Sequence, residues 1–178
     1  MARVSFAVLK EKIGTLEGDK SFDYFKSSTI PRGVPKGAII ELTGTAKTEW
    51  LAHFFSENNE LRTFWIEDKL TLLPTALSQR GVNLANICIA HAPENLFKAV
   101  RVALRSQVFH CLVLPFVFEE ERELKALQLL TEKANATAFV LSQTKSSFWP
   151  ITAQFEINHG TNEQFHIQTH KYKRQGIA

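Results

Sequence analysis

The chain has 178 residues, 44% of them hydrophobic and 22% charged, a composition that excludes a disordered, collagen-like or low-complexity protein and favours one globular domain. Lys and Arg total 21 against 18 Asp and Glu, so the net charge of +3 does not by itself imply a nucleic-acid partner. No run reaches the roughly 18 apolar residues that span a bilayer, and Lys10 and Lys12 interrupt the apolar N-terminus. We therefore expect a cytoplasmic protein that makes no membrane contact.

In chain order, residues 1–30 combine a short amphipathic piece with a polar stretch, and we interpret them as an N-terminal extension or docking arm. Short apolar runs rich in β-branched residues then alternate with helical apolar spacing. The expected strands cover 37–44, 62–68, 86–92, 108–116 and 137–143. The expected helices cover 47–58, 70–81, 94–107 and 119–135. Two further strands, 152–160 and 163–174, follow without a helix between them.

This alternation predicts a three-layer α/β domain over residues 31–178, since strands that alternate with helices form parallel βαβ units. The last two strands predict an antiparallel hairpin at one edge of the sheet.

The cysteines and histidines do not suggest a metal or redox site. Cys88 and Cys111 both lie in apolar runs, which predicts buried, reduced thiols, and no CxxC pair is present. His166 and His170 lie four positions apart in an expected strand, a spacing of about 13 Å that is too long for one ion. We expect no metal and no cofactor.

Residues 44–48 follow the first long strand and resemble an incomplete phosphate loop. A functional loop has the pattern GxxxxGK[ST], in which the Lys comes six positions after the first Gly. Here Lys47 and Thr48 stand before a helix, but Gly44 lies three positions before Lys47, and Ala46 replaces the second glycine. A loop this short, which consists of Gly44, Thr45, Ala46, Lys47 and Thr48, is predicted to be a vestigial phosphate loop that binds no nucleotide. The alternative is an ATPase that uses a compressed loop.

From about Thr29 to Gly176 the chain resembles the RecA-type recombinase core. The resemblance is carried by IPRGVPKGAIIELTG, RTFWIED, ALSQRGVNLANICIA and FHCLVLPF, which follow in the family's order. It implies a RecA-like fold and a nucleotide site.

The chain departs from that family at two carboxylates. Pro115 stands near the family's magnesium-binding Asp, and Lys69 lies nearest the family's water-activating Glu, with Glu67 and Asp68 close by. Because phosphoryl transfer needs the metal and the positioned water together, the departures predict a pseudo-ATPase rather than an enzyme.

Among shortened relatives of the recombinase, the chain is most similar to ImuA-type and SulA-type proteins. The ImuA-type resemblance implies a non-catalytic accessory of the bacterial DNA-damage (SOS) response and translesion synthesis, which binds the recombinase RecA and translesion polymerase components. The SulA-type alternative implies a cell-division inhibitor that binds FtsZ. The complete βαβ series and the basic C-terminus favour the ImuA-type interpretation, and self-association is compatible with it.

The basic tail is the first candidate contact surface. Lys171, Lys173 and Arg174 surround Tyr172, a pattern that suits a phosphate backbone or a protein partner, with weak DNA binding as one outcome. A solvated edge strand whose lysines prevent aggregation explains the same pattern.

Aromatic residues provide further candidates. Phe148 and Trp149 lie in a loop-like SSFWP segment and are expected to expose their rings, and Phe54 and Phe55 are weighed as interface residues beside them. The basic residues of 94–107, which are Lys98, Arg101 and Arg105, are expected to form a solvent-exposed face.

Overall fold

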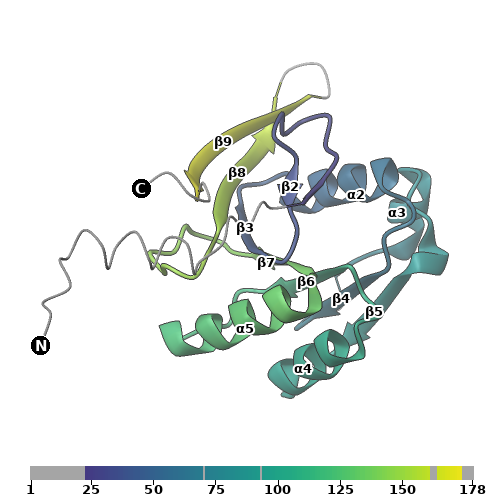
Figure 1. The fold of residues 1–178 in the computed structure, drawn as a ribbon. Helices are drawn as coiled ribbons and strands as arrows, with labels where there is room; N and C mark the ends of the chain where they lie inside the picture. Colours follow the sequence, from purple (N-terminus) through teal and green to yellow (C-terminus); the bar gives the residue numbers. More distant parts are fainter. Residues whose placement is uncertain (1–22, 70, 93, 161–163, 174–178) are drawn as a thin grey trace, which may run out of the picture.

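The computed structural model describes residues 23–69, 71–92, 94–160 and 164–173 (Figure 1). The strands are β1 (Tyr24–Phe25), β2 (Val34–Pro35), β3 (Ile39–Thr43), β4 (Thr63–Glu67), β5 (Ile87–His91), β6 (Cys111–Pro115), β7 (Thr137–Leu141), β8 (Ala153–His159) and β9 (Phe165–Tyr172). The helices are α2 (Lys47–Glu57), α3 (Pro74–Gln79), the 3₁₀ turn η1 (Leu84–Asn86), α4 (Leu96–Ser106) and α5 (Glu121–Ala134).

Seven strands form the main sheet in the order β5-β4-β6-β7-β3-β8-β9. Every pairing is parallel except that of β8 with β9, which is antiparallel. The predicted α/β class, the mainly parallel sheet and the C-terminal hairpin are therefore confirmed. The parallel pairings among β3, β4, β5, β6 and β7 follow from the helical crossovers, because a strand that returns through a helix re-enters the sheet in the same direction. Strand β8 also pairs parallel with β3, but residues 142–152, which lead to it from β7, contain no helix.

Helices cover both faces of the sheet (Figure 1). One hydrophobic cluster contains α2 and α3 and is rich in aromatic rings, while the other contains α4 and α5. The alternation of side chains along β3 explains the two clusters, since Ile40 and Leu42 belong to the first and Ile39 to the second. The sheet is thus the middle layer of three.

The aromatic side chains of α2 lie inside the domain. Phe54 and Phe55 are 0% and 1% exposed, and the ring of Phe54 lies 5.4 Å from that of Phe139 on β7. Their expected role as interface residues is wrong, because the face of α2 that carries them packs onto the sheet. Cys111 is buried as predicted, but Cys88 is exposed, because β5 stands at the edge of the described sheet, where it pairs with β4 on one side.

Part of the expected N-terminal extension packs on the domain. Strands β1 and β2 form a small hairpin, and Phe25 and Ile30 are 8% and 5% exposed. The Trp50 indole donates a hydrogen bond of 2.7 Å to Thr29 Oγ1. In the structure, residues 23–30 therefore belong to the packed domain, and residues 1–22 of the expected docking arm lie outside the described residues.

Among the described helices, none is long and apolar enough to cross a membrane.

Candidate functional site

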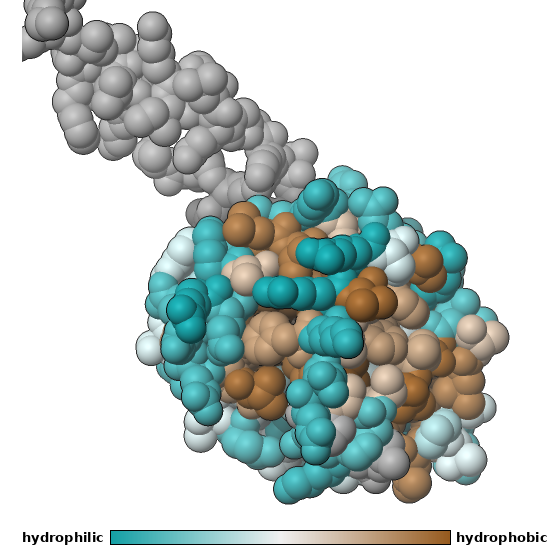
Figure 2. Space-filling model, turned by 90° about the horizontal axis from the view of Figure 1, so that it is seen from below, coloured by the Kyte–Doolittle hydropathy of each residue, from teal (hydrophilic) through white to brown (hydrophobic). Residues whose placement is uncertain are grey.

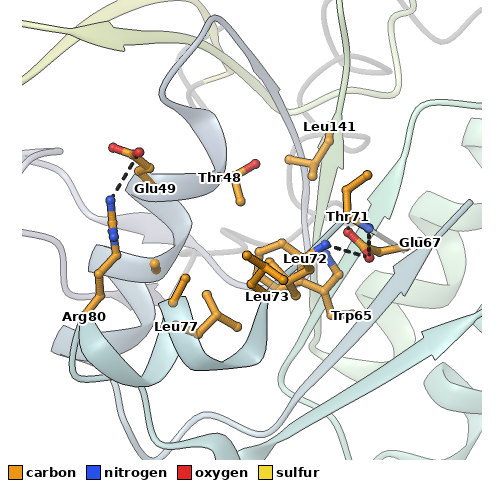
Figure 3. A pocket seen from close by; sticks show the side chains of 12 residues that line it. Thr48, Glu49, Trp65, Glu67, Thr71, Leu72, Leu73, Leu77, Arg80 and Leu141 are labelled. Atoms are coloured by element: carbon orange, nitrogen blue, oxygen red, sulfur yellow. Dashed lines mark hydrogen bonds and ion pairs between the residues drawn. The ribbon is translucent and has the colours of Figure 1, made fainter. Parts of the chain in front are cut away.

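The carboxyl ends of β3, β4, β6 and β7 border a cleft of about 780 Å³. Open α/β sheets bind ligands at this edge. Most of the residues that line the cleft have hydroxyl, amide or charged side chains, and they come from the phosphate-like loop, from the segment at the end of β4 and from residues 142–147. A smaller and more apolar pocket of about 320 Å³ adjoins it between α2 and α3, and the two share Thr48, Trp65, Glu67, Thr71 and Leu141 (Figure 3).

The phosphate-like loop lies directly against β8. Gly44 has a φ of +89°, which turns the chain sharply out of β3. The Thr45 amide and hydroxyl both donate to Asn158 Oδ1, at 3.0 and 3.2 Å. The Ala46 amide donates to the Ile157 carbonyl oxygen at 3.0 Å. Two amides that would face a phosphate in a working loop are thus bonded to the neighbouring strand.

Lys47 turns back on its own loop. Its ammonium donates to the Gly44 carbonyl oxygen at 3.1 Å, and burial lowers the pKa of Lys47 below its ordinary value. Ala46, which stands where the phosphate loop has its second glycine, is 0% exposed. Its side chain belongs to the hydrophobic cluster that contains α2 and α3 and is not among the residues that line the cleft.

Like Lys47, Glu67 at the end of β4 is hydrogen-bonded to nearby residues of its own chain segment. One carboxylate oxygen accepts hydrogen bonds from the amides of Thr71 and Leu72 at 3.0 and 3.1 Å, and the other accepts from the Thr71 hydroxyl at 3.2 Å. Figure 3 shows this carboxylate turned toward residues 71–72 beside the smaller pocket. The arrangement holds the segment after β4 in a turn. Next to Glu67, both Asp68 and Lys69 are exposed.

Glu41, in the middle of β3, is a fully buried carboxylate that was not predicted as a site residue. It accepts hydrogen bonds from Ser142 Oγ at 2.9 Å, from the Ser146 amide at 3.2 and 3.3 Å, and from Gln154 Nε2 at 2.6 Å. These bonds fasten the loop after β7, which forms one wall of the cleft. The signal was a lone glutamate inside the apolar run AIIELT, where a buried charge requires several donors.

The structure brings two of the predicted contact groups together. The Lys171 ammonium donates to the carbonyl oxygens of Phe148 and Trp149 at 3.0 and 3.4 Å, and that of Lys173 also donates to the Trp149 carbonyl. The ammonium groups of Lys125 and Lys173 lie 4.3 and 4.9 Å from the centre of the Trp149 ring. Burial lowers the pKa values of Lys171 and Lys173, and neighbouring lysines lower that of Lys173 further.

The aromatic members of these groups differ in exposure. Trp149 is 48% exposed, whereas Phe148 is half-buried and stacks on Phe116 with ring centres 6.1 Å apart. The Tyr172 ring lies 6.0 Å from that of Phe155, and its hydroxyl donates to the Gly33 carbonyl oxygen at 3.3 Å. Burial, followed by the neighbouring Tyr24, raises the pKa of Tyr172 to about 12. Arg174 lies outside the described residues.

Within the described part of the chain, no group of three or more His, Cys, Asp and Glu side chains is arranged to hold a metal ion. No protein-family model matches this sequence, and no curated protein shows significant similarity to it.

Proposed function

We propose that the protein is a RecA-type pseudo-ATPase, a non-catalytic domain that acts by binding other proteins in the bacterial DNA-damage response, as ImuA-type proteins do. The observation that carries the proposal is the hydrogen bonding of the Thr45 and Ala46 amides to β8. The response itself is inferred from the sequence resemblance alone.

Triphosphate binding in a phosphate loop depends on successive backbone amides that point at the phosphate oxygens. Here those amides already have partners in Ile157 and Asn158. A phosphate would have to displace both bonds and separate the loop from β8. Each lost bond costs about 1 kcal/mol net, and more where the freed group stays buried.

Of the two carboxylates that phosphoryl transfer would need here, one is already hydrogen-bonded and the other is replaced. Glu67 is held by Thr71 and Leu72, so orienting a water molecule would require breaking those hydrogen bonds. Strand β6 ends at Pro115, which offers no metal ligand where the recombinase family has an Asp. Without nucleotide, the protein has no γ-phosphate to order or release a loop, and its partner surfaces are preformed.

Calorimetry with ATP and Mg²⁺ tests the nucleotide part of the proposal. We expect no binding heat for the wild-type protein. Asn158→Ala, which frees the Thr45 amide and hydroxyl, is the matched variant. We expect that it also binds no ATP, because the Ile157 carbonyl oxygen still accepts the hydrogen bond from the Ala46 amide. Micromolar binding of ATP to the wild-type protein would refute this part of the proposal and favour the alternative, an ATPase with a compressed loop.

Parallel pull-downs test the partner class. We expect the protein to retain the bacterial recombinase or translesion polymerase components rather than FtsZ. Retention of FtsZ alone would favour the division-inhibitor alternative. If the protein retains none of these partners, the assignment to the DNA-damage response is refuted.

A further inference from the structure

An apolar hollow outside the cleft lies between α4 and the sheet, beside Phe64 of β4. This α4 groove has a volume of about 540 Å³. It is lined by Phe64, Ala99, Val102, Ala103 and Phe109, with Asn95, Lys98 and Ser106 at its rim. Figure 2 shows apolar side chains at the surface between hydrophilic ones on the side of the molecule where α4 and α5 lie.

The groove has an aromatic floor and an exposed aliphatic wall. The rings of Phe64 and Phe109 lie 5.2 Å apart, and both side chains are half-buried. Val102, which lines the groove, is 64% exposed. Apolar hollows with aromatic floors provide the buried anchor positions of protein interfaces.

A positively charged stripe borders the groove. Lys98, Arg101 and Arg105 are exposed and follow one another at intervals of three and four residues, which places them on one side of α4. Val102 lies next to this stripe on the helix surface. Within the described part of the chain, none of the three cations has a carboxylate partner within ion-pair distance.

We propose that the α4 groove binds an amphipathic segment of a partner protein that inserts apolar side chains between Val102 and Phe109 and places carboxylates against the basic stripe. The proposal deepens the protein-binding function and rests on it. Charge complementarity selects the acidic character of the segment, and the apolar lining selects its amphipathic character. A single-stranded nucleic acid is disfavoured, because its sites carry accessible aromatic faces along a charged track, and here the aromatic rings form the floor of a hollow.

The chain contains a reporter for this site. Cys88 pairs in register with Phe64, so its side chain stands beside the floor of the groove, and it is exposed. Cys111 is fully buried, and burial raises the pKa of its thiol well above the usual range. An environment-sensitive maleimide dye will therefore label Cys88 selectively in the folded protein.

The probe is a helical peptide of about 15 residues with Leu on one stripe and Glu beside it. We expect saturable binding that shifts the dye emission and weakens as salt is raised. The same peptide with Lys in place of Glu, and a single-stranded oligonucleotide, are the comparison ligands. Equal or tighter binding of either would overturn the proposal, as would an absence of binding by the Glu peptide. A dye signal that depends on protein concentration alone would assign the groove to a second copy and also overturn it.

Two variants locate the binding. Val102→Asp and Arg101→Glu alter the groove and the stripe separately, and each should weaken the Glu peptide about tenfold. Lys133→Glu, at an exposed position in the last turn of α5, is the matched charge reversal and should leave affinity within about twofold. Circular dichroism confirms folding of each variant. Wild-type affinity in both groove variants would refute the site, whereas ATP binding in the calorimetry would refute the pseudo-ATPase and leave this result standing.

Discussion

The contact between the phosphate-like loop and β8 can be measured by adding one methyl group. A Cβ at Gly44 would overlap the carbonyl oxygen of Ile157 and lie 2.8 Å from its carbonyl carbon. Gly81 has a similar φ, +83° against +89°, but a Cβ there would have Ser56 Cβ as its nearest neighbour at 3.7 Å. Gly81→Ala is therefore a control for backbone conformation without the close approach.

The expected difference follows from these two environments. The left-handed backbone costs an alanine about 1–2 kcal/mol at either position. At Gly44 the methyl also forces β8 away and breaks the hydrogen bond from Ala46 to Ile157, worth about 1 kcal/mol net and more if the groups stay buried. Gly44→Ala should thus lose about 1–3 kcal/mol more than Gly81→Ala.

Urea unfolding of the three proteins, followed by fluorescence and by circular dichroism, gives the two free-energy differences. Equal losses for Gly44→Ala and Gly81→Ala would refute the reasoning, because they would mean that the loop separates from β8 at no cost. That result would also weaken the argument that the contact with β8 keeps the phosphate-like loop from binding a nucleotide.

Three further predictions concern groups outside the loop. Glu41→Gln replaces an acceptor that faces three donor groups by an amide, and should lower the free energy of unfolding by about 2 kcal/mol in urea. Tyr172 should ionise at about pH 12 in a titration followed at the phenolate absorbance, and Tyr172→Phe should remove that step. Its raised pKa contributes stability that is complete below pH 10 and is lost as the pH rises toward 12. Iodide should quench Trp149 more strongly than caesium, because two ammonium groups lie 4.3 and 4.9 Å from its ring centre.

Each has an internal control. An exposed glutamate, Glu132, changed to Gln should alter stability by less than about 0.5 kcal/mol. Trp50 and Trp65 are 0% and 1% exposed, so Trp149→Phe should abolish most of the quenching. An unchanged free energy of unfolding in Glu41→Gln would contradict the hydrogen bonds to Glu41. A Tyr172 titration step near pH 10 would contradict the burial of its hydroxyl, and equal quenching by the two ions would contradict the ammonium groups beside Trp149.

The regular elements were predictable because their signals are local. The apolar spacing that predicted a helix over 94–107 corresponds to α4 at Leu96–Ser106, and the apolar run 137–143 corresponds to β7 at Thr137–Leu141. The hairpin of β1 and β2 was missed, since strands of two residues leave no periodic pattern. The exposure of Cys88 was missed as well, because composition cannot distinguish an edge strand from a central one.

The candidate site was predictable only in part. The shortness of the loop could be counted along the chain, but the bond from Thr45 to Asn158 joins residues 113 positions apart. Glu41 and Gln154 are separated by the same distance in sequence. Contacts of this kind depend on which strands become neighbours, and the alternation of strands and helices does not specify that order.

The hydrogen bond from Tyr172 to Gly33 has a consequence for synthesis, because it joins positions 139 residues apart. The last described strand must reach the first hairpin before the domain is closed, so the domain cannot finish folding during synthesis until Tyr172 has left the ribosome. Such distant pairings slow folding, and until β9 arrives, the outer edge of β8 is an unpaired template for other chains.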